Sequence, residues 1–129
     1  MKYYIGQKAS FSKTISESDV YLFAGISGDF NSLHINKVEA EKSQFGERIV
    51  PGILTVSLIS TVLGTIFPGN GTIYLEQNAK FIKPVKIGDT LTAIVEMIDI
   101  NGNRAILKTD VVNQNKILVL EGSAKIKLP

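Results

Sequence analysis

The single histidine of the chain, His34, lies five residues after an aspartate in the stretch GDFNSLHIN, residues 28–36. A carboxylate and an imidazole that hold one water molecule between them can take a proton from it and deliver a proton elsewhere, which is general acid–base chemistry. The glycine, asparagines and serine around the pair predict irregular chain rather than helix or strand. Asp29 and His34 are the candidate catalytic residues, and the alternative is a turn-forming aspartate with a structural histidine.

A second candidate group is the backbone of Gly52, at the start of a segment without charged side chains, PGILTVSLISTVLGTIF. We predict a helix that begins near Gly52 and ends before Pro68. The first N–H groups of a helix have no intrahelical acceptor and lie at the positive end of its dipole. The Gly52 N–H therefore suits a carbonyl oxygen that gains negative charge, and glycine lets a ligand come close to the backbone.

The uncharged run extends from Ile49 to Leu75, and its stretch IVPGILTVSLISTVLGTIF is about long enough to cross a bilayer, so a membrane span is an alternative. Pro51, Gly64 and several hydroxyl side chains favour instead the buried centre of a globular domain. One side of the helix carries only small residues, and two roles are open for it: close approach of the sheet, or the lining of a cavity with hydroxyl groups. The residues of this side are Ser57, Ser60, Thr61 and Gly64.

Alternation and capping signals predict the remaining elements. Residues 7–15 form a strand, residues 16–29 a helix with Ser16 as its N-cap and Gly25 or Gly28 at its end, and residues 37–43 a short helical piece. The second half alternates with a period of two and predicts four strands, at residues 72–85, 89–100, 104–114 and 116–128. Their apolar positions begin with Ile73, Leu75, Ala79 and Phe81 in the first strand and Leu91, Ala93, Val95 and Met97 in the second.

These four strands are expected to form an antiparallel meander with one apolar face. The helix that starts at Gly52 is the element hydrophobic enough to cover that face. We therefore predict an α+β fold in which a curved antiparallel sheet wraps around a long central helix. The length of 129 residues, without linkers or repeats, predicts a single domain over residues 1–129.

Composition narrows the function classes. Fourteen basic and twelve acidic residues give a formal charge of +2, and the basic residues form no stripe for a nucleic acid. The absence of cysteine excludes disulfides and thiolate chemistry, and one histidine makes a metal site unexpected. No dinucleotide, P-loop or GxSxG motif occurs. The N-terminal MKYYIGQKAS lacks the apolar core of a signal peptide, so a cytoplasmic location is expected.

Three stretches together carry a family resemblance: GDFNSLHIN, then FGERIVPGILTVSLIS, then IYLEQNAKFIKPVKIGDTLTAIVEM. This set resembles the MaoC-type (R)-specific enoyl-CoA hydratases of the hot-dog fold, and the likeness covers nearly the whole chain. Two positions depart from the family pattern: Pro51 stands where histidine is common, and Ser32 where proline is usual. Both departures put pocket shape and substrate preference in doubt more than the chemistry.

The resemblance implies a role for five residues. Asp29 and His34 match the family's catalytic pair, Asn31 the asparagine that arranges the loop, Gly52 the donor to the thioester oxygen, and Ser60 a serine that supports the site. The implied reaction is the reversible syn addition of water to a trans-2-enoyl-CoA, which gives an (R)-3-hydroxyacyl-CoA. No metal or other cofactor is implied, since coenzyme A arrives with the substrate. The implied assembly is a homodimer or higher homo-oligomer, with two sheets joined and the acyl tunnel near the interface.

Other functions on this scaffold stay open at the level of sequence. A thioesterase or a dehydratase of acyl-carrier-protein substrates uses the same fold, and a non-catalytic acyl-CoA-binding module would not need the paired acid and base. Lys80, Lys83 and Lys86 are either contacts for coenzyme A phosphates or solvated lysines of the sheet edge. Acyl chain length and physiological direction are not predicted.

Overall fold

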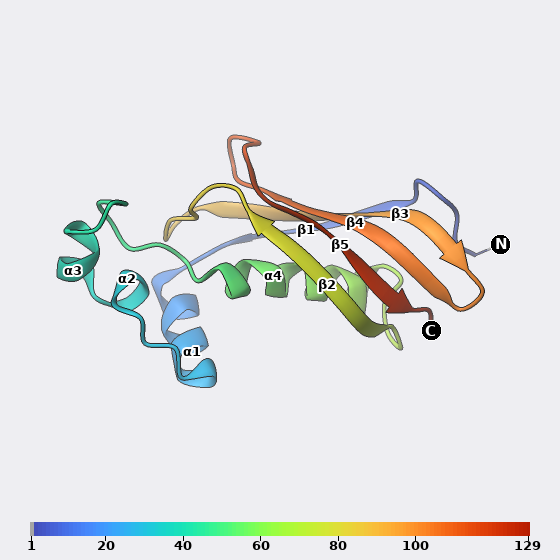
Figure 1. Cartoon of the computed structure of the whole chain (residues 1–129), viewed down its shortest axis with the longest axis horizontal. Coiled ribbons are helices and arrows are strands. Elements are labelled where there is room, and N and C mark those ends of the chain that lie inside the picture. The colour runs from blue at the N-terminus through green and yellow to red at the C-terminus, as the bar shows by residue number, and fades with distance from the viewer. Residues whose placement is uncertain (1) are drawn as a thin grey trace.

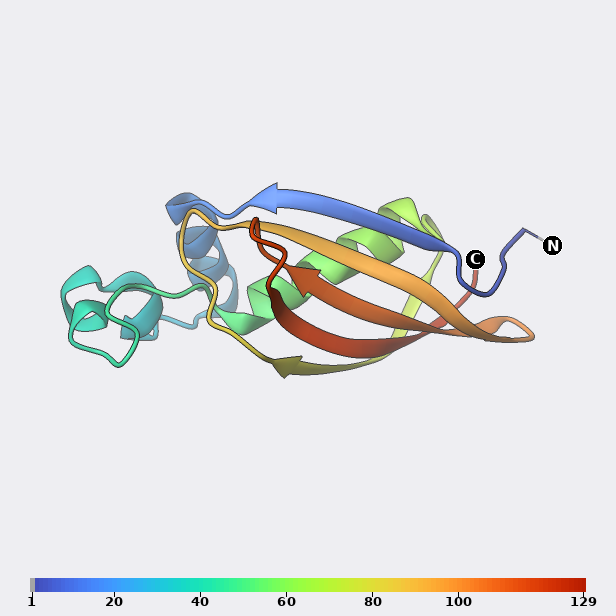
Figure 2. The ribbon, with the colours of Figure 1, turned by 90° about the horizontal axis from the view of Figure 1, so that it is seen from above.

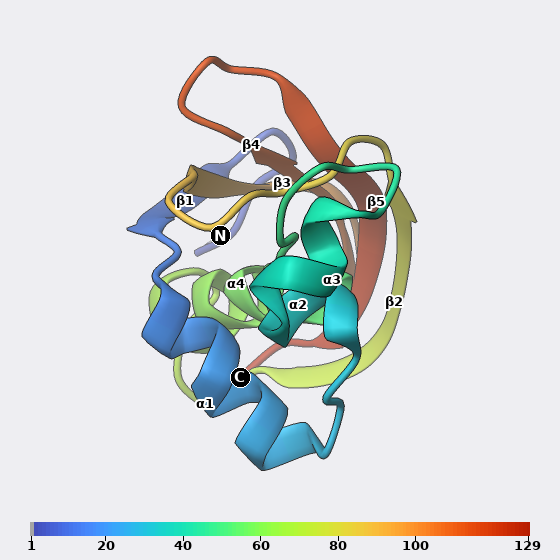
Figure 3. The same cartoon turned by 90° about the vertical axis from the view of Figure 1, so that its left-hand side faces the viewer.

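The computed structural model describes residues 2–129 and consists of one curved antiparallel sheet wrapped around a helix (Figures 1 and 2). The three helices that precede the central one gather at one end of the molecule, away from both chain termini (Figure 1), and Figure 3 views this end. In chain order the elements are β1 (Lys8–Thr14), α1 (Glu17–Ser27), α2 (Ser32–Ile35), α3 (Lys37–Glu41), α4 (Gly52–Thr61), the π-helical turn η1 (Val62–Ile66), β2 (Ile73–Phe81), β3 (Thr90–Asn101), β4 (Arg104–Val112) and β5 (Leu118–Lys127).

The core lies between the inner face of the sheet and one side of α4. The apolar positions predicted for β3, from Leu91 to Met97, are all fully buried, so the period-two pattern is confirmed there. From α4, Leu58 and Ile59 pack into the same hydrophobic cluster, together with Val62 at the start of η1. The predicted α+β architecture, with a curved antiparallel sheet around a central helix, is confirmed.

The predicted four-strand meander is wrong in its strand order. The sheet has the order β1-β3-β4-β5-β2, so β3, β4 and β5 form a meander, whereas β2 pairs with β5 at the edge. Because β2 and β3 are not neighbours, their connection, residues 82–89, forms no hairpin. It passes beside Val50, whose N–H donates to the carbonyl of Val85 over 2.7 Å. Alternation identifies the face of a strand but not its neighbour.

The predicted inner face of β2 is correct only in its second half. Ala79 and Phe81 pair with inward-facing positions of β5, but the register shifts between Tyr74 and Glu76. This bulge carries one extra residue, so the alternation changes phase and Leu75 lies outside the core. Tyr74 instead pairs with the buried Ile126.

The side of the central helix that carries small residues faces away from the sheet. Ser57 and Ser60 are exposed, and Thr61 and Gly64 are partly exposed, so the first proposed role, close approach of the sheet, is wrong. The sheet packs instead on the side that contains Thr55, Leu58 and Ile59. Over residues 2–129, no helix is long and apolar enough to cross a membrane, and the alternative of a span at α4 and η1 is not supported.

The helix predicted after β1 is confirmed as α1, and its ends are those that the sequence signals. Ser16 and Asp19 form a reciprocal capping box: the Ser16 hydroxyl accepts from the Asp19 N–H, and the Asp19 carboxylate accepts from the Ser16 N–H. Of the two glycines proposed for its end, Gly28 is the cap, with φ 79° in the left-handed region that glycine adopts at low cost.

Candidate active site

His34 lies on a one-turn helix, α2, where irregular chain was expected. Asn31 makes that turn possible, because its side-chain oxygen accepts from the N–H of Leu33 over 3.0 Å and caps the helix. From sequence alone an asparagine predicts a loop as readily as a helix cap, because the same residue type serves both purposes. Asn31 therefore fixes the backbone on which the candidate histidine is carried.

The orientation of the imidazole follows from one hydrogen bond. His34 Nδ1 lies 2.8 Å from the carbonyl oxygen of Ile49, and His34 is only 8% exposed. A carbonyl oxygen can only accept, so Nδ1 carries the hydrogen and, in the neutral ring, Nε2 holds the lone pair. The second contact between the two segments, from the N–H of Ile49 to the carbonyl of Leu33 over 3.1 Å, holds this geometry. His34 thus offers Nε2 as a proton acceptor.

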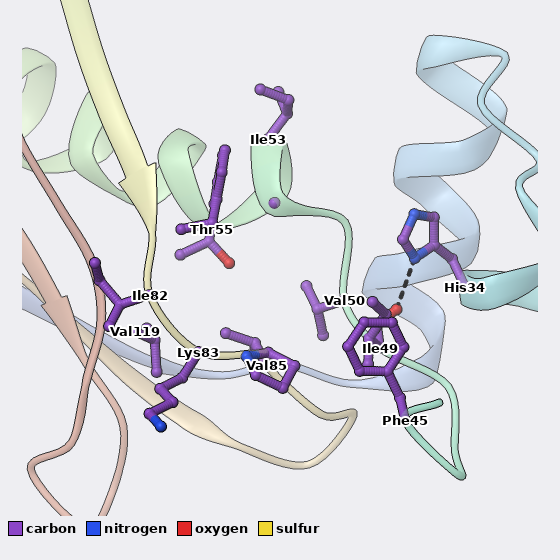
Figure 4. Close-up of a pocket in the computed structure, with 13 residues that line it drawn as sticks. His34, Phe45, Ile49, Val50, Ile53, Thr55, Ile82, Lys83, Val85 and Val119 are labelled. Atoms are coloured by element: carbon purple, nitrogen blue, oxygen red, sulfur yellow. Dashed lines mark hydrogen bonds between the residues drawn. The ribbon is translucent and has the colours of Figure 1, made fainter. Parts of the chain in front are cut away.

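A cavity of about 510 Å³ connects His34 to the start of α4. Its walls are mostly apolar and come from the loop before α4, from α4 itself, and from the β2–β3 connection (Figure 4). A volume of this size is typical of sites for small molecules. The lining consists of His34, Phe45, Ile49, Val50, Gly52, Ile53, Thr55, Phe81, Ile82, Lys83, Pro84, Val85 and Val119.

Gly52 is the first residue of α4 and lines this cavity beside His34. The first intrahelical bonds are made by the N–H groups of Leu54 and Thr55 to the carbonyl of Pro51, which leaves the Gly52 N–H at the open end of the helix. A Cβ here would lie 2.5 Å from Cε1 of Phe81, so any larger residue requires the half-exposed Phe81 ring to move. The arrangement pairs a hydrogen-bond donor with a proton acceptor in one apolar cavity.

Asp29, Asn31 and Ser60 are not part of this lining. Asp29 is exposed after the end of α1, and its Oδ1 accepts from the Asn31 N–H over 3.1 Å. No direct hydrogen bond joins Asp29 to His34 within residues 2–129. Ser60 lies on the uncovered side of α4, about 12 Å along the helix from Gly52. Of the five predicted site residues, the cavity unites His34 and Gly52, and the roles of Asp29, Asn31 and Ser60 stay predictions.

Several lining residues were not predicted, and Thr55 is the one with functional chemistry. It lies three and four residues before Leu58 and Ile59, on the core side of α4, where a hydroxyl is unexpected. That conflict between a polar residue and an apolar face is the signal that the sequence contained. Of the three lysines proposed for phosphate contact, Lys83 lines the cavity, and Lys86 forms an ion pair with Glu47 over 3.2 Å.

The loop that carries Ile49 is tied to α1 by Arg48. Its guanidinium donates to the carboxylate of Glu17 and, over 2.9 Å, to the hydroxyl of Tyr21. The hydrogen bond with Glu17 raises the pKa of Arg48 above its usual value. Among the residues that the structure describes, no three histidine, cysteine, aspartate or glutamate side chains gather in a group that could hold a metal ion.

Comparison with known proteins gives one consistent result. The family described as MaoC like domain matches residues 2–119. An (R)-specific enoyl-CoA hydratase of Rhodospirillum rubrum is 45% identical over 126 residues, 96% of this chain and 87% of that protein. A 3-hydroxybutyryl-CoA dehydratase of Methylorubrum extorquens is 39% identical over 127 residues, 97% of this chain and 80% of that protein.

A solved structure agrees with both relatives. The (R)-hydratase from Aeromonas caviae involved in PHA biosynthesis superimposes with a TM-score of 0.95 at 40% identity, over 98% of each chain. The likeness thus extends through the whole curved sheet, the central helix and the segment that carries His34, and the predicted hot-dog fold is confirmed. The chain belongs to the MaoC-like domain family.

Proposed function

We propose that this protein is an (R)-specific enoyl-CoA hydratase, a hydro-lyase that adds water to a trans-2-enoyl-CoA and catalyses the reverse dehydration. The observation that carries the proposal is the shared cavity of His34, with Nε2 as proton acceptor, and Gly52, with a free helix-terminal N–H. The identity of 39–45% with two enzymes named for this chemistry supports the same activity. The apolar remainder of the cavity suits an acyl thioester.

In the proposed reaction the oxygen of one water molecule bonds to C3 of the substrate while a proton passes from that water to the base. The electrons of the C2–C3 double bond move toward the carbonyl and form an enolate, whose oxygen accepts from the Gly52 N–H. The protonated base then delivers a proton to C2 on the same face, the carbonyl re-forms, and the base is regenerated. His34 Nε2 is positioned to accept from the water, and Asp29 is the second member of the pair.

No metal or redox cofactor takes part in this proposal, because the base, the donor and the water account for every proton and electron. Asp29 is exposed and lies outside the lining of the cavity, and its proposed role is to hold the same water as His34. Its second oxygen, Oδ2, makes no hydrogen bond with any described residue and is available for this role. Asn31 takes part in the proposed site by capping α2. For Ser60, which is exposed on the uncovered side of α4, the proposed supporting role rests on the family resemblance alone.

We also propose a homodimer, which two exposed apolar surfaces support. The strand β2 is an edge of the sheet and exposes Ile73 and Leu75. The second surface surrounds Asp29 and includes Phe30, 61% exposed, and Ile26, 85% exposed. A second copy would cover both surfaces and remove one unpaired strand edge. Sedimentation of the protein should give twice the mass of the chain, and Leu75→Lys should shift the protein toward the monomer.

The expected cytoplasmic location stays a prediction.

The decisive experiment mixes the protein with crotonyl-CoA and follows the loss of absorbance of the conjugated thioester. Hydration with formation of (R)-3-hydroxybutyryl-CoA supports the proposal. Release of free thiol would favour a thioesterase, binding without turnover would favour a non-catalytic module, and turnover only of the acyl-carrier-protein thioester would favour the carrier-protein dehydratase. Each of these outcomes contradicts the proposed activity.

A further inference from the structure

The hydroxyl of Thr55 is the one polar group in the cavity wall without an evident purpose. Thr55 is 1% exposed, and its Oγ1 has no hydrogen-bond partner within residues 2–129. A buried hydroxyl without a partner costs about 1–3 kcal/mol, so such a group calls for an explanation. The oxygen is itself covered, so a ligand in the cavity supplies the missing partner once the side chains over the oxygen move aside.

Other hydroxyls of the same helical segment behave differently. Ser57 donates to the carbonyl of Leu54, and Thr65 donates over 2.6 Å to the carbonyl of Thr61. Inside a helix, serine and threonine hydroxyls usually form a hydrogen bond in this way, by donation to a carbonyl of the preceding turn. Thr55 forms no such bond. Its oxygen instead points toward Val50 and Val85, two residues of the cavity wall (Figure 4).

The position of Thr55 relative to the other site groups defines what it can reach. Thr55 lies three residues after Gly52, about 4.5 Å along the axis of α4 and on nearly the same face. His34 and Thr55 lie at opposite ends of the lining, with the first turn of α4 between them (Figure 4). A thioester carbonyl at Gly52 that directs C2 and C3 toward His34 therefore directs its sulfur toward Thr55.

From this arrangement we infer that Thr55 is a substrate-binding residue whose hydroxyl binds the amide of the pantetheine arm nearest the thioester sulfur. The inference rests on the proposed function. That amide follows the sulfur after two methylene groups, a span close to one helical turn of about 5 Å. It is the first polar group on this side of the carbonyl, and both coenzyme A and carrier-protein thioesters contain it. A threonine hydroxyl can donate to its carbonyl or accept from its N–H.

Lys83 extends the same path toward solvent. It lines the cavity on the Thr55 side, next to Val85 (Figure 4). Among the described residues it takes part in none of the ion pairs, in contrast to Lys86, which pairs with Glu47. A free cation beyond the amide-binding hydroxyl suits the phosphates at the far end of coenzyme A.

The test measures the coupling between the hydroxyl and the amide in a double-mutant cycle. Wild type, Thr55→Val and Thr55→Ser are assayed with two small substrates, the crotonyl thioester of N-acetylcysteamine, which keeps the amide, and crotonyl S-pentyl thioester, in which carbon replaces it. Thr55→Val should lower kcat/KM about two- to tenfold for the amide substrate, as expected for one neutral hydrogen bond. The S-pentyl thioester should not be affected, and Thr55→Ser should keep the preference of the wild type.

The outcomes separate this inference from the proposed function. Equal losses on both substrates would mean a structural role for Thr55 and overturn the inference, although the hydratase activity would stand. The inference is also overturned if Thr55→Val keeps the wild-type kcat/KM on both small thioesters but loses kcat/KM on an enoyl substrate whose acyl chain carries a hydroxyl group. The Thr55 side chain would then face the acyl end of the substrate, and the hydratase activity would again stand. Failure of the wild type to hydrate crotonyl-CoA itself would overturn the proposed function, and the inference with it.

Discussion

Two regions of the molecule are held together by different forces. The sheet–helix body, which comprises the five strands with α1 and α4, owes its order to apolar burial, with one continuous cluster of fully buried side chains. The α2–α3 segment, residues 29–50, buries few apolar side chains and depends on polar ones that cap its short helices. Asn31 and Asn36 cap α2 and α3 in this way, each through a hydrogen bond of 3.0 Å to a nearby N–H.

The α2–α3 segment is joined to the body by few contacts, and these lie beside the site. Arg48 binds Glu17 and Tyr21 of α1, and the N–H of Val50 donates to the carbonyl of Val85 in the β2–β3 connection. Local regions with little apolar burial open at a lower free energy than the core. The candidate catalytic residues are thus carried by the less stable region and the oxyanion donor by the more stable one. Changes in the two regions should affect activity and stability separately.

The largest effect should come from the predicted catalytic pair. Asp29→Asn and His34→Ala should each lower kcat for crotonyl-CoA by about 10²–10⁴-fold, the usual contribution of a positioned acid or base. Asp29→Asn should leave the unfolding midpoint unchanged, because asparagine keeps the oxygen that accepts from Asn31 and the side chain is exposed. Asp99→Asn, an exposed aspartate outside the cavity, is the matched control. Normal turnover of Asp29→Asn would remove Asp29 from the mechanism.

A core truncation in the body should have the opposite signature. Leu107 of β4 is fully buried and does not line the cavity. Leu107→Ala should lower the free energy of unfolding by about 2–5 kcal/mol, since the lost burial and the remaining cavity both destabilise. Denaturant titration measures the loss, and kcat at a temperature where the variant is folded should stay near the wild-type value. A large fall in kcat of the folded variant would show that the two regions are not separable.

A lost helix cap in the α2–α3 segment should be felt only locally. The Asn36 side chain accepts from the N–H of Glu39 at the start of α3. Asn36→Ala should cost α3 about 0.5–2 kcal/mol, the typical value of an N-cap. Hydrogen exchange should accelerate in residues 37–43, whereas the global unfolding midpoint should move little. An equal shift in both measurements would mean that this segment unfolds together with the body.

The same contrast explains what the sequence could predict. In the body, alternation in β3 and the capping box at Ser16 are local patterns with one dominant structural meaning, so the elements and the buried face followed from them. The failures in the body are non-local. The pairing of β2 with β5 depends on which strand lies nearest in space, and the bulge after Tyr74 shifts the alternation by one position without a composition signal.

In the site, the sequence indicated the candidate residues more readily than which of them lie in one cavity. The spacing of Asp29 and His34 and the helix start at Gly52 indicated donors and acceptors, yet the cavity that joins His34 to Gly52 needs the β2–β3 connection as its wall. No local pattern places residues 82–85 there. Thr55 is not among the predicted residues, because it lies on the core side of α4 and not on the small-residue side, which faces away from the sheet.

The smallest expected effect comes from Asp19, which caps α1 in the sheet–helix body. The change should appear in the unfolding of the whole protein and not only near α1. The backbone N–H of Ser16 is the main cause that lowers the pKa of Asp19 below 3.8, with a further contribution from Lys13. A carboxylate whose pKa is lowered in the folded state stabilises the fold. This stabilisation is complete at a pH above the pKa of the unfolded state, and it is lost as the pH falls through the pKa of the folded state. Asp19→Asn should therefore flatten the decline of the unfolding free energy below about pH 4. Because α1 buries Val20 in the core, the loss should appear in global unfolding, in contrast to the Asn36 variant, and an unchanged acid slope would contradict this coupling.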